Sequence, residues 1–184
     1  YDLIKIEQTP DYWYTDKNGK RHRDTLLTNN YVIIRTIEYI DSVVNAENDI
    51  NKCVPESFEF IFGYISNNAL AKDLEDELTI YWRNKFRNKE YQDRVLKNHP
   101  YWSKHYETTS SENYVELHHS EEERQTIELT TSEHKTRLVS IHSSKGDGRW
   151  CVIAFNINEA VLKIYTNGEM NQTYESLLNV AWTR

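Results

Sequence analysis

In Phe58-Glu59-Phe60-Ile61-Phe62-Gly63-Tyr64-Ile65, apolar side chains occupy both alternating faces after the second residue. A strand that faces water on one side would alternate, so this run predicts a strand buried on both sides in a mostly parallel sheet. Ser66-Asn67-Asn68 follows and offers helix caps. Three leucines then recur at helical spacing among charged residues, namely Leu70, Leu74 and Leu78. Together they predict a strand, a cap and an amphipathic helix in succession.

Upstream of this unit, a second amphipathic helix is predicted by apolar residues at helical spacing. These residues are Ile33, Ile37, Ile40 and Val44. A polar loop from Asn45 to Glu56 is expected after that helix. Residues 1–28 are polar and aromatic, and the turn signal Asp16-Lys17-Asn18-Gly19-Lys20 predicts two short extended arms on either side of it.

Downstream, residues 88–113 are charged and rich in Tyr, which predicts one helix around Tyr91 to Leu96 and a surface excursion after Pro100. Short strands, a turn and a final helix are expected in the remainder. The strand candidates are Tyr114–His118, Thr126–Leu129, Leu138–Ile141 and Trp150–Phe155, the turn is Ser132–Lys135, the stretch Glu159–Ile164 is ambiguous, and Thr173 can cap the last helix. Strands that alternate with helices predict an α/β fold class.

Composition narrows the class of protein. The chain has 184 residues and a net charge of −7, which argues against a free-standing nucleic-acid coat or a membrane-surface binder while leaving room for a local basic site. No apolar stretch approaches a membrane span. Of the two cysteines, Cys53 and Cys151, the second lies in an apolar run and is expected to be buried, and an intracellular location is preferred. The ends of the chain suggest a fragment of a longer protein.

A cationic turn separates two of the apolar runs: Ser140-Ile141-His142-Ser143-Ser144-Lys145-Gly146-Asp147-Gly148-Arg149. Glycines let the backbone approach a ligand closely, and hydroxyls with a lysine suit phosphate. An ordinary connecting loop explains the composition equally well. A complete phosphate-cradling G-x-x-x-x-G-K-[ST] loop is absent from the sequence.

Ser140 to Gly146 resembles motif V of superfamily 1 helicases of the UvrD, Rep and PcrA type, whose form is close to T-x-H-x-x-K-G-L-E. Leu177-Leu178-Asn179-Val180-Ala181-Trp182-Thr183-Arg184 resembles their motif VI, L-L-Y-V-A-L-T-R, in the right order downstream. Weaker similarities are Leu26 to Tyr31, to the L-x-x-N-Y-R-S block, and Ser66 to Glu75, to a T-N-A-x-S-R-x-x-E segment. In style the loop is most similar to helicases of large eukaryotic DNA viruses.

The resemblance implies a RecA-like second motor domain over residues 29–184, with residues 1–28 as the end of a preceding region and an excursion at about 88–113. It implies that Arg184 reaches the γ-phosphate of ATP. It also implies two groups of further contacts. The ATP-binding or coupling residues are Ser143, Ser144, Lys145, Gly146, Asp147, Gly148 and Thr183, and the residues near single-stranded DNA are Ser140, His142 and Lys72. ATP with Mg²⁺ would be bound mainly by the first RecA-like domain of the same polypeptide, and DNA replication or repair is the expected setting.

Three positions depart from the family pattern. Val32 stands where the family has an arginine, with Arg35 one helical turn further on. Gly148 stands where a glutamate contacts the ribose, and Lys72 replaces an arginine and so loses bidentate geometry. The departures at Val32 and Gly148 leave open a motor-like nucleic-acid-binding or regulatory module without motor activity. The acidic charge and the Tyr-rich residues 88–113 leave open a structural or interaction domain.

Two other groups of residues suggest sites with less force. His118-His119 beside Glu121-Glu122-Glu123 could suggest a metal, but no Cys or His at zinc spacing accompanies them, so a solvated charge run is preferred. The tyrosines and tryptophans from Tyr81 to Tyr106 could stack on bases, although rings of this kind more often pack in a core.

Overall fold

The computed structural model describes residues 10–63, 69–108, 114–118, 132–141, 148–166 and 175. The chain forms two compact units, Tyr1–Ser42 and Val43–Arg184. Their border falls within the helix α1 (Thr25–Ala46). The predicted strand at Thr126–Leu129 lies outside the described residues, and so does the predicted final helix apart from Glu175.

The first unit opens with a β-hairpin whose strands are β1 (Trp13–Thr15) and β2 (Arg21–Arg23). The turn is held by Asp16, whose Oδ1 accepts hydrogen bonds from the backbone N–H of Asn18 (2.8 Å) and Lys20 (2.9 Å). Gly19 supplies the positive φ of 78° that the turn requires. The two extended arms predicted around this turn are thereby confirmed.

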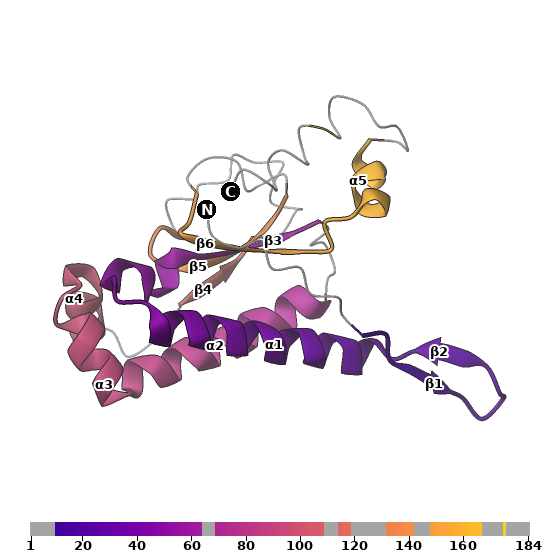
Figure 1. Cartoon of the computed structure of the whole chain (residues 1–184), viewed down its shortest axis with the longest axis horizontal. Coiled ribbons are helices and arrows are strands. Elements are labelled where there is room, and N and C mark those ends of the chain that lie inside the picture. The colour runs from indigo at the N-terminus through magenta and orange to yellow at the C-terminus, as the bar shows by residue number, and fades with distance from the viewer. Residues whose placement is uncertain are drawn as a thin grey trace. The chain divides into compact units, whose positions relative to one another are not determined.

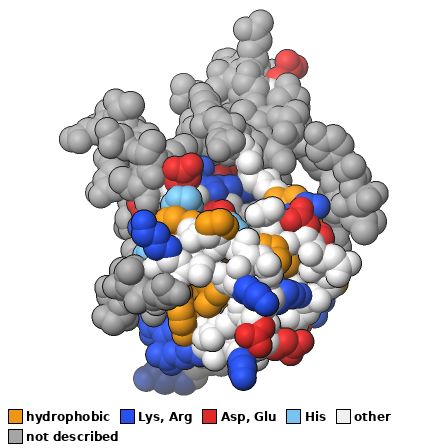
Figure 2. Space-filling model, turned by 90° about the vertical axis from the view of Figure 1, so that its left-hand side faces the viewer, with side chains coloured by type: hydrophobic (Ala, Val, Ile, Leu, Met, Phe, Trp, Pro, Cys, Tyr) orange, Lys and Arg blue, Asp and Glu red, His pale blue; other side chains and the backbone are white. Residues whose placement is uncertain are grey.

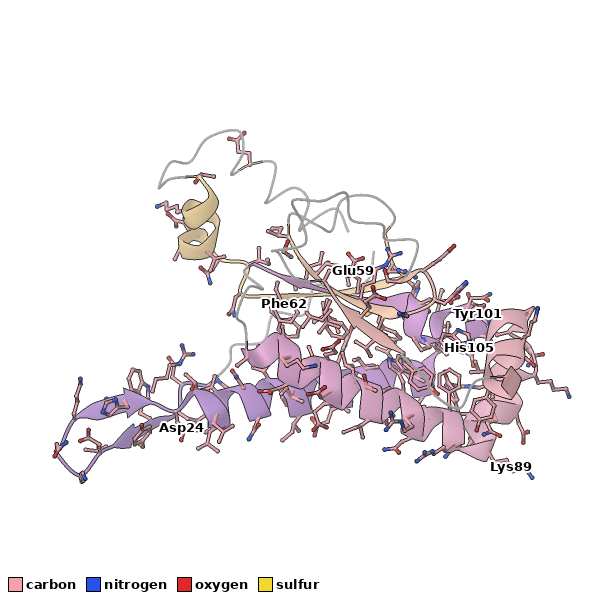
Figure 3. The ribbon with its side chains drawn as sticks, turned by 180° about the vertical axis from the view of Figure 1, so that it is seen from behind. Asp24, Glu59, Phe62, Lys89, Tyr101 and His105 are labelled. Carbon is pink, nitrogen blue, oxygen red and sulfur yellow. The ribbon has the colours of Figure 1, made fainter. Side chains whose placement is uncertain are left out.

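The helix α1 begins earlier than the apolar spacing indicates. Asp24 precedes it and accepts a hydrogen bond from the N–H of Leu27 at 2.9 Å, which caps the first turn. Figure 3 labels Asp24 at this junction between hairpin and helix. Of the predicted core positions Ile33, Ile40 and Val44 are buried, whereas Ile37 is partly exposed. The following stretch holds two short 3₁₀ helices, η1 (Ile50–Lys52) and η2 (Pro55–Ser57), where a polar loop was expected.

The second unit is built on a parallel sheet, and its described strands lie in the order β4-β5-β3-β6 (Figure 1). They are β4 (Val115–Leu117), β5 (Thr136–Ser140), β3 (Phe58–Phe62) and β6 (Cys151–Phe155). Every residue of β3 is buried, and its neighbours on both sides run parallel to it. The predicted doubly buried strand and the α/β class with helices flanking a parallel sheet are therefore confirmed.

The helix α2 (Ala69–Arg87) packs on one face of this sheet. The predicted apolar positions Leu70, Leu74 and Leu78 are all buried. Trp82 extends the same stripe, lies 5.6 Å from the Phe58 ring, and donates its Nε1–H to Thr136 Oγ1 at 2.9 Å. Burying the indole is tolerable because its polar edge finds an acceptor on β5.

Three helical segments follow: α3 (Lys89–Tyr91), the π-helical η3 (Gln92–Leu96) and α4 (Pro100–Thr108). The helix predicted near Tyr91 is confirmed, but the surface excursion predicted after Pro100 is wrong. Pro100 opens a helix, where its missing N–H costs no hydrogen bond. Trp102 is only 2% exposed because it packs against Phe86, with 4.9 Å between ring centroids.

The last described helix is α5 (Glu159–Tyr165), which settles the ambiguous stretch. Asn158 caps it, accepting a hydrogen bond from the N–H of Val161 at 3.1 Å. The cysteines are both free, and Cys53 is fully buried. The predicted burial of Cys151 is only partial, because β6 is the edge strand of the described sheet.

Candidate functional site

Three parallel strands end together at one edge of the sheet. Phe62 at the end of β3 is level with Ser140 of β5 and Phe155 of β6. The register continues one residue further, since Ile141 donates its N–H to Phe62 O (2.9 Å) and Gly63 donates to Phe155 O (3.0 Å). Ligands of open α/β sheets bind outside the carboxyl ends of the strands, so this edge is the place to look for a site.

Gly63 makes the close packing of this edge possible. A Cβ at this position would lie 2.6 Å from Asn156 O and 2.7 Å from Val161 Cγ1. Asn156 itself has a φ of 55°, a left-handed conformation that Asn adopts more readily than most residues. The connection from β6 to α5 thus passes directly over the end of β3, and only a glycine leaves room for it.

Of the residues in the cationic turn, Ser140 and Ile141 are placed at this edge, and Ser140 is the one predicted as a site residue. It is the last residue of β5 and is 2% exposed. Figure 3 shows Phe62 and Glu59 of the neighbouring strand β3 on opposite sides of the sheet, as strand alternation requires. The predicted residues His142, Ser143, Ser144, Lys145, Gly146 and Asp147 lie outside the described residues, as do Thr183 and Arg184.

The far end of the turn lies at the opposite edge of the sheet. Arg149 donates from Nη1 to the carbonyls of Glu56 (2.6 Å) and Glu133 (2.7 Å), and from Nη2 to that of Ser132 (3.1 Å). These carbonyls precede β3 and β5. Because β6 begins level with Phe58, four residues before Phe62, the two edges are separated by about 13 Å of strand. Gly148 is therefore not brought together with Ser140.

Lys72 lies in the first turn of α2, and its side chain is 59% exposed. Its ammonium contacts Glu75 Oε2 at 2.8 Å and Asp76 Oδ1 at 3.3 Å. The hydrogen bond to Glu75 is the main cause that raises the pKa of Lys72, and Asp76 raises it by a smaller amount. Lys72 is thus charged and accessible, but a phosphate would have to compete with two carboxylates for it.

Arg35 is the cation nearest in sequence to the arginine that Val32 replaces. It lies on α1 in the first unit, with its side chain 43% exposed, and its Nη1 pairs with Glu38 Oε2 at 2.6 Å. An exposed pair of this kind is weak, so Arg35 is available for exchange with another anion.

The amino edge of the sheet holds a cluster of side chains that no local sequence pattern indicates. Glu56 Oε1 lies 3.2 Å from His99 Nε2, and Glu56 Oε2 lies 2.8 Å from His134 Nδ1. Tyr101 stacks on His134 at 3.5 Å between ring centroids, and burial, with the nearby Glu56, raises the pKa of its hydroxyl. Figure 3 labels Tyr101 and His105 on α4, and Figure 2 shows His side chains at the surface between hydrophobic and charged ones.

Metal binding finds no support in the described ranges, where no three His, Cys, Asp or Glu side chains gather suitably for an ion. His118 is 8% exposed and its Nε2 lies 3.2 Å from Ser132 Oγ, so it belongs to the buried structure around β4 and β5 and not to a solvated charge run. The tyrosines and tryptophans considered as base-stacking candidates include three that are buried in the core: Trp82, Tyr91 and Trp102.

Comparison with known proteins finds no relative of this chain. No family model, no curated protein and no solved structure matches it. Within the described part of the chain, no helix has both the length and the apolar character that crossing a membrane requires.

Proposed function

We propose that this chain is the second, RecA-like motor domain of a superfamily 1 DNA helicase, which couples ATP hydrolysis to movement along single-stranded DNA. The observation that carries the proposal is the position of Ser140. The segment that resembles motif V leaves the sheet at the carboxyl end of β5, directly beside the end of the central strand β3. That is the edge at which parallel α/β sheets bind their ligands.

In this proposal the chain supplies part of a composite site. Arg184 would stabilise the charge that develops on the γ-phosphate during attack by water, as an arginine finger does. Residues 143–148 and Thr183 would couple the nucleotide to the DNA, with Ser140, His142 and Lys72 nearer the strand. ATP and Mg²⁺ would be held mainly by the first motor domain of the same polypeptide, inside the cell. The similarity of the loop to helicases of large eukaryotic DNA viruses favours a virus-encoded protein.

The test uses the intact polypeptide that carries both motor domains. Arg184→Ala should leave ATP binding largely intact and lower turnover by about 10³. Arg184→Lys should recover little of this loss, because an ammonium cannot reproduce the guanidinium geometry. Arg87→Ala, an exposed arginine at the end of α2, is the matched control and should leave basal turnover unchanged.

Turnover by Arg184→Ala equal to that of the parent protein would refute the assignment. The purified 184-residue chain gives a second check, since it should not hydrolyse ATP alone. Arg184-dependent turnover by this chain in isolation would contradict the division of labour between two domains.

A second candidate is a motor-like module that binds nucleic acid without turnover. Val32 favours it, because the family has a phosphate-binding arginine at this position. Gly148 also favours it, because the family has a ribose-contacting glutamate there, and because Gly148 is separated from Ser140 across the sheet. A gene that encodes no G-x-x-x-x-G-K-[ST] loop and acidic pair upstream would favour this candidate, or a purely structural domain, over the helicase.

A further inference from the structure

The β1–β2 hairpin presents two chemically different faces. Residues directly opposite each other in an antiparallel pair share a face, and successive residues alternate. Trp13 is opposite Arg23, and Thr15 is opposite Arg21, so these four residues form one face, called here the Trp13 face. Tyr14 and His22 lie opposite each other on the other face, where their rings stack at 5.4 Å.

The Trp13 face combines an open aromatic ring with cations. Trp13 is 47% exposed, and the guanidinium carbon of Arg21 lies 4.8 Å from the centroid of its ring. Arg23 lies across the strand pair and contacts Asp11 at 2.8 Å, with both side chains at least half exposed. An ion pair this exposed contributes little stability, so a phosphate can replace the carboxylate.

The hairpin residues carry a net positive charge, whereas the whole chain is net negative. Residues 12–23 contain four Lys and Arg and one acid, and Asp11 and Asp24 flank them on either side, whereas the whole chain has a net charge of −7. The acid, Asp16, is occupied by the backbone N–H groups of the turn and by His22 Nε2 at 2.9 Å. Lys17 and Lys20 are exposed at the tip, and within the described residues neither has an ion-pair partner. The strands and turn of the hairpin therefore carry a net positive charge, in contrast to the acidic chain as a whole.

We propose that the Trp13 face binds single-stranded nucleic acid, with a base stacked on Trp13 and flanking phosphates on Arg21 and Arg23. Stacking of a base on an aromatic side chain contributes about 1–3 kcal/mol and tolerates any sequence, and guanidinium groups suit phosphate oxygens. A duplex hides the faces of its bases, whereas a single strand offers both a face and a phosphate at each nucleotide. The proposal requires neither ATP nor the residues of the cationic turn.

The experiment measures binding of the full chain to a fluorescein-labelled oligothymidylate at low salt by fluorescence anisotropy. Trp13→Ala should weaken binding by about 5-fold to 150-fold, the equivalent of one lost stacking contact. Trp13→Phe should retain most of the affinity. The matched control is Tyr14→Ala, which removes an equally exposed ring (52%) from the opposite face and should leave affinity within about twofold.

Equal losses in Trp13→Ala and Tyr14→Ala, or no loss in either, would overturn the proposal. If the alanine variant disturbs the hairpin, Arg21→Gln combined with Arg23→Gln keeps two polar side chains on this face without their charge and should still weaken binding at least tenfold. Trp13-dependent sedimentation with anionic phospholipid vesicles, without oligothymidylate binding, would also refute it in favour of a membrane surface.

Failure of this proposal is distinguishable from failure of the proposed motor function. In the intact polypeptide, Trp13→Ala should leave ATP turnover without nucleic acid unchanged, and Arg184→Ala should leave oligothymidylate affinity unchanged in the absence of ATP. Each variant thus reports on one proposal alone.

Discussion

At the scale of single residues, adding one methyl group at Gly63 would obstruct the packing of the carboxyl edge of the sheet. A Cβ there would meet the backbone oxygen of Asn156 at 2.6 Å, and backbone cannot move aside as a flexible side chain can. We expect Gly63→Ala to lower the free energy of unfolding by about 1–3 kcal/mol, the usual range for overpacking. Urea denaturation followed by tryptophan fluorescence measures it.

Gly148 provides the matched control for that substitution. Among the described residues, nothing lies within 4 Å of a Cβ built at Gly148, and its φ is not in the left-handed range. Gly148→Ala should therefore leave stability unchanged or raise it by up to about 1 kcal/mol, because alanine restricts the unfolded chain. If both alanine variants lost the same stability, the crowding at Gly63 would not be the cause.

Cys53 makes the stability of the protein sensitive to alkaline pH. Its thiol is buried near the carbonyls of Val44, Glu47 and Asp49, and burial raises its pKa above the ordinary 9.0. The folded state then holds the proton more tightly than the unfolded state, so stability is complete below pH 9.0 and is lost as the pH rises through the folded pKa. Burial also raises the pKa of Tyr91, whose hydroxyl donates to Cys53 O at 2.8 Å and adds to the loss at higher pH.

The test compares unfolding free energies at about pH 8 and about pH 10. Cys53→Ser removes the titrating thiol while keeping a donor for the same carbonyls, so it should reduce the loss between the two pH values. Cys151→Ser replaces the partly exposed cysteine and should leave that loss as it is in the parent protein. An unchanged loss in Cys53→Ser would show that the thiol does not titrate as described.

At the scale of elements, Arg149 ties the start of β6 to the segments before β3 and β5 through three carbonyls. Arg149→Met keeps much of the side-chain volume but leaves those carbonyls without the guanidinium. Hydrogen bonds to a charged group contribute about 1.5–3 kcal/mol each, and partial replacement by water should bring the total loss to about 3 kcal/mol. Arg87→Met, at an exposed position, should change stability by less than about 0.5 kcal/mol in the same denaturation assay. Equal stability of the two variants would refute this role.

How much of the fold the sequence predicts depends on whether the signal is local. β3 and α2 are predicted correctly because Phe58 to Phe62 and Leu70 to Leu78 carry their own periodicity. The burial of Trp102 is not predictable in this way, since it depends on Phe86 and Tyr114, which come from α2 and from just before β4. The spacing of apolar residues indicates the structure of one segment at a time and not the contacts between segments.

The same limit applies to the candidate site. Ser140 to Arg149 reads as one loop in the sequence, and its two ends would lie together if β5 and β6 were antiparallel. Both strands run parallel to β3, so the described ends of the loop lie at opposite edges of the sheet. The Trp13 face is not evident from the sequence for a related reason, since Trp13 and Arg21 meet only through the pairing of β1 with β2. The alternation of side chains on either side of the turn at Asp16 is the pattern that indicates this face.

At the scale of the whole molecule, an acidic chain can bind a polyanion only through local charge, and salt dependence measures how many cations take part. For single strands, the logarithm of the affinity falls with that of salt concentration by about 0.7 for each phosphate contacted. Four hairpin cations, Lys17, Lys20, Arg21 and Arg23, therefore limit the slope to about −3. Arg21→Gln with Arg23→Gln should make it shallower by about 1.4, whereas Trp13→Ala should lower the affinity for oligothymidylate at every salt concentration without changing the slope. Stacking and ion release are separable contributions to the affinity, so the two variants report on different contacts. If the double variant left the slope unchanged, the phosphate contacts would lie elsewhere on the protein.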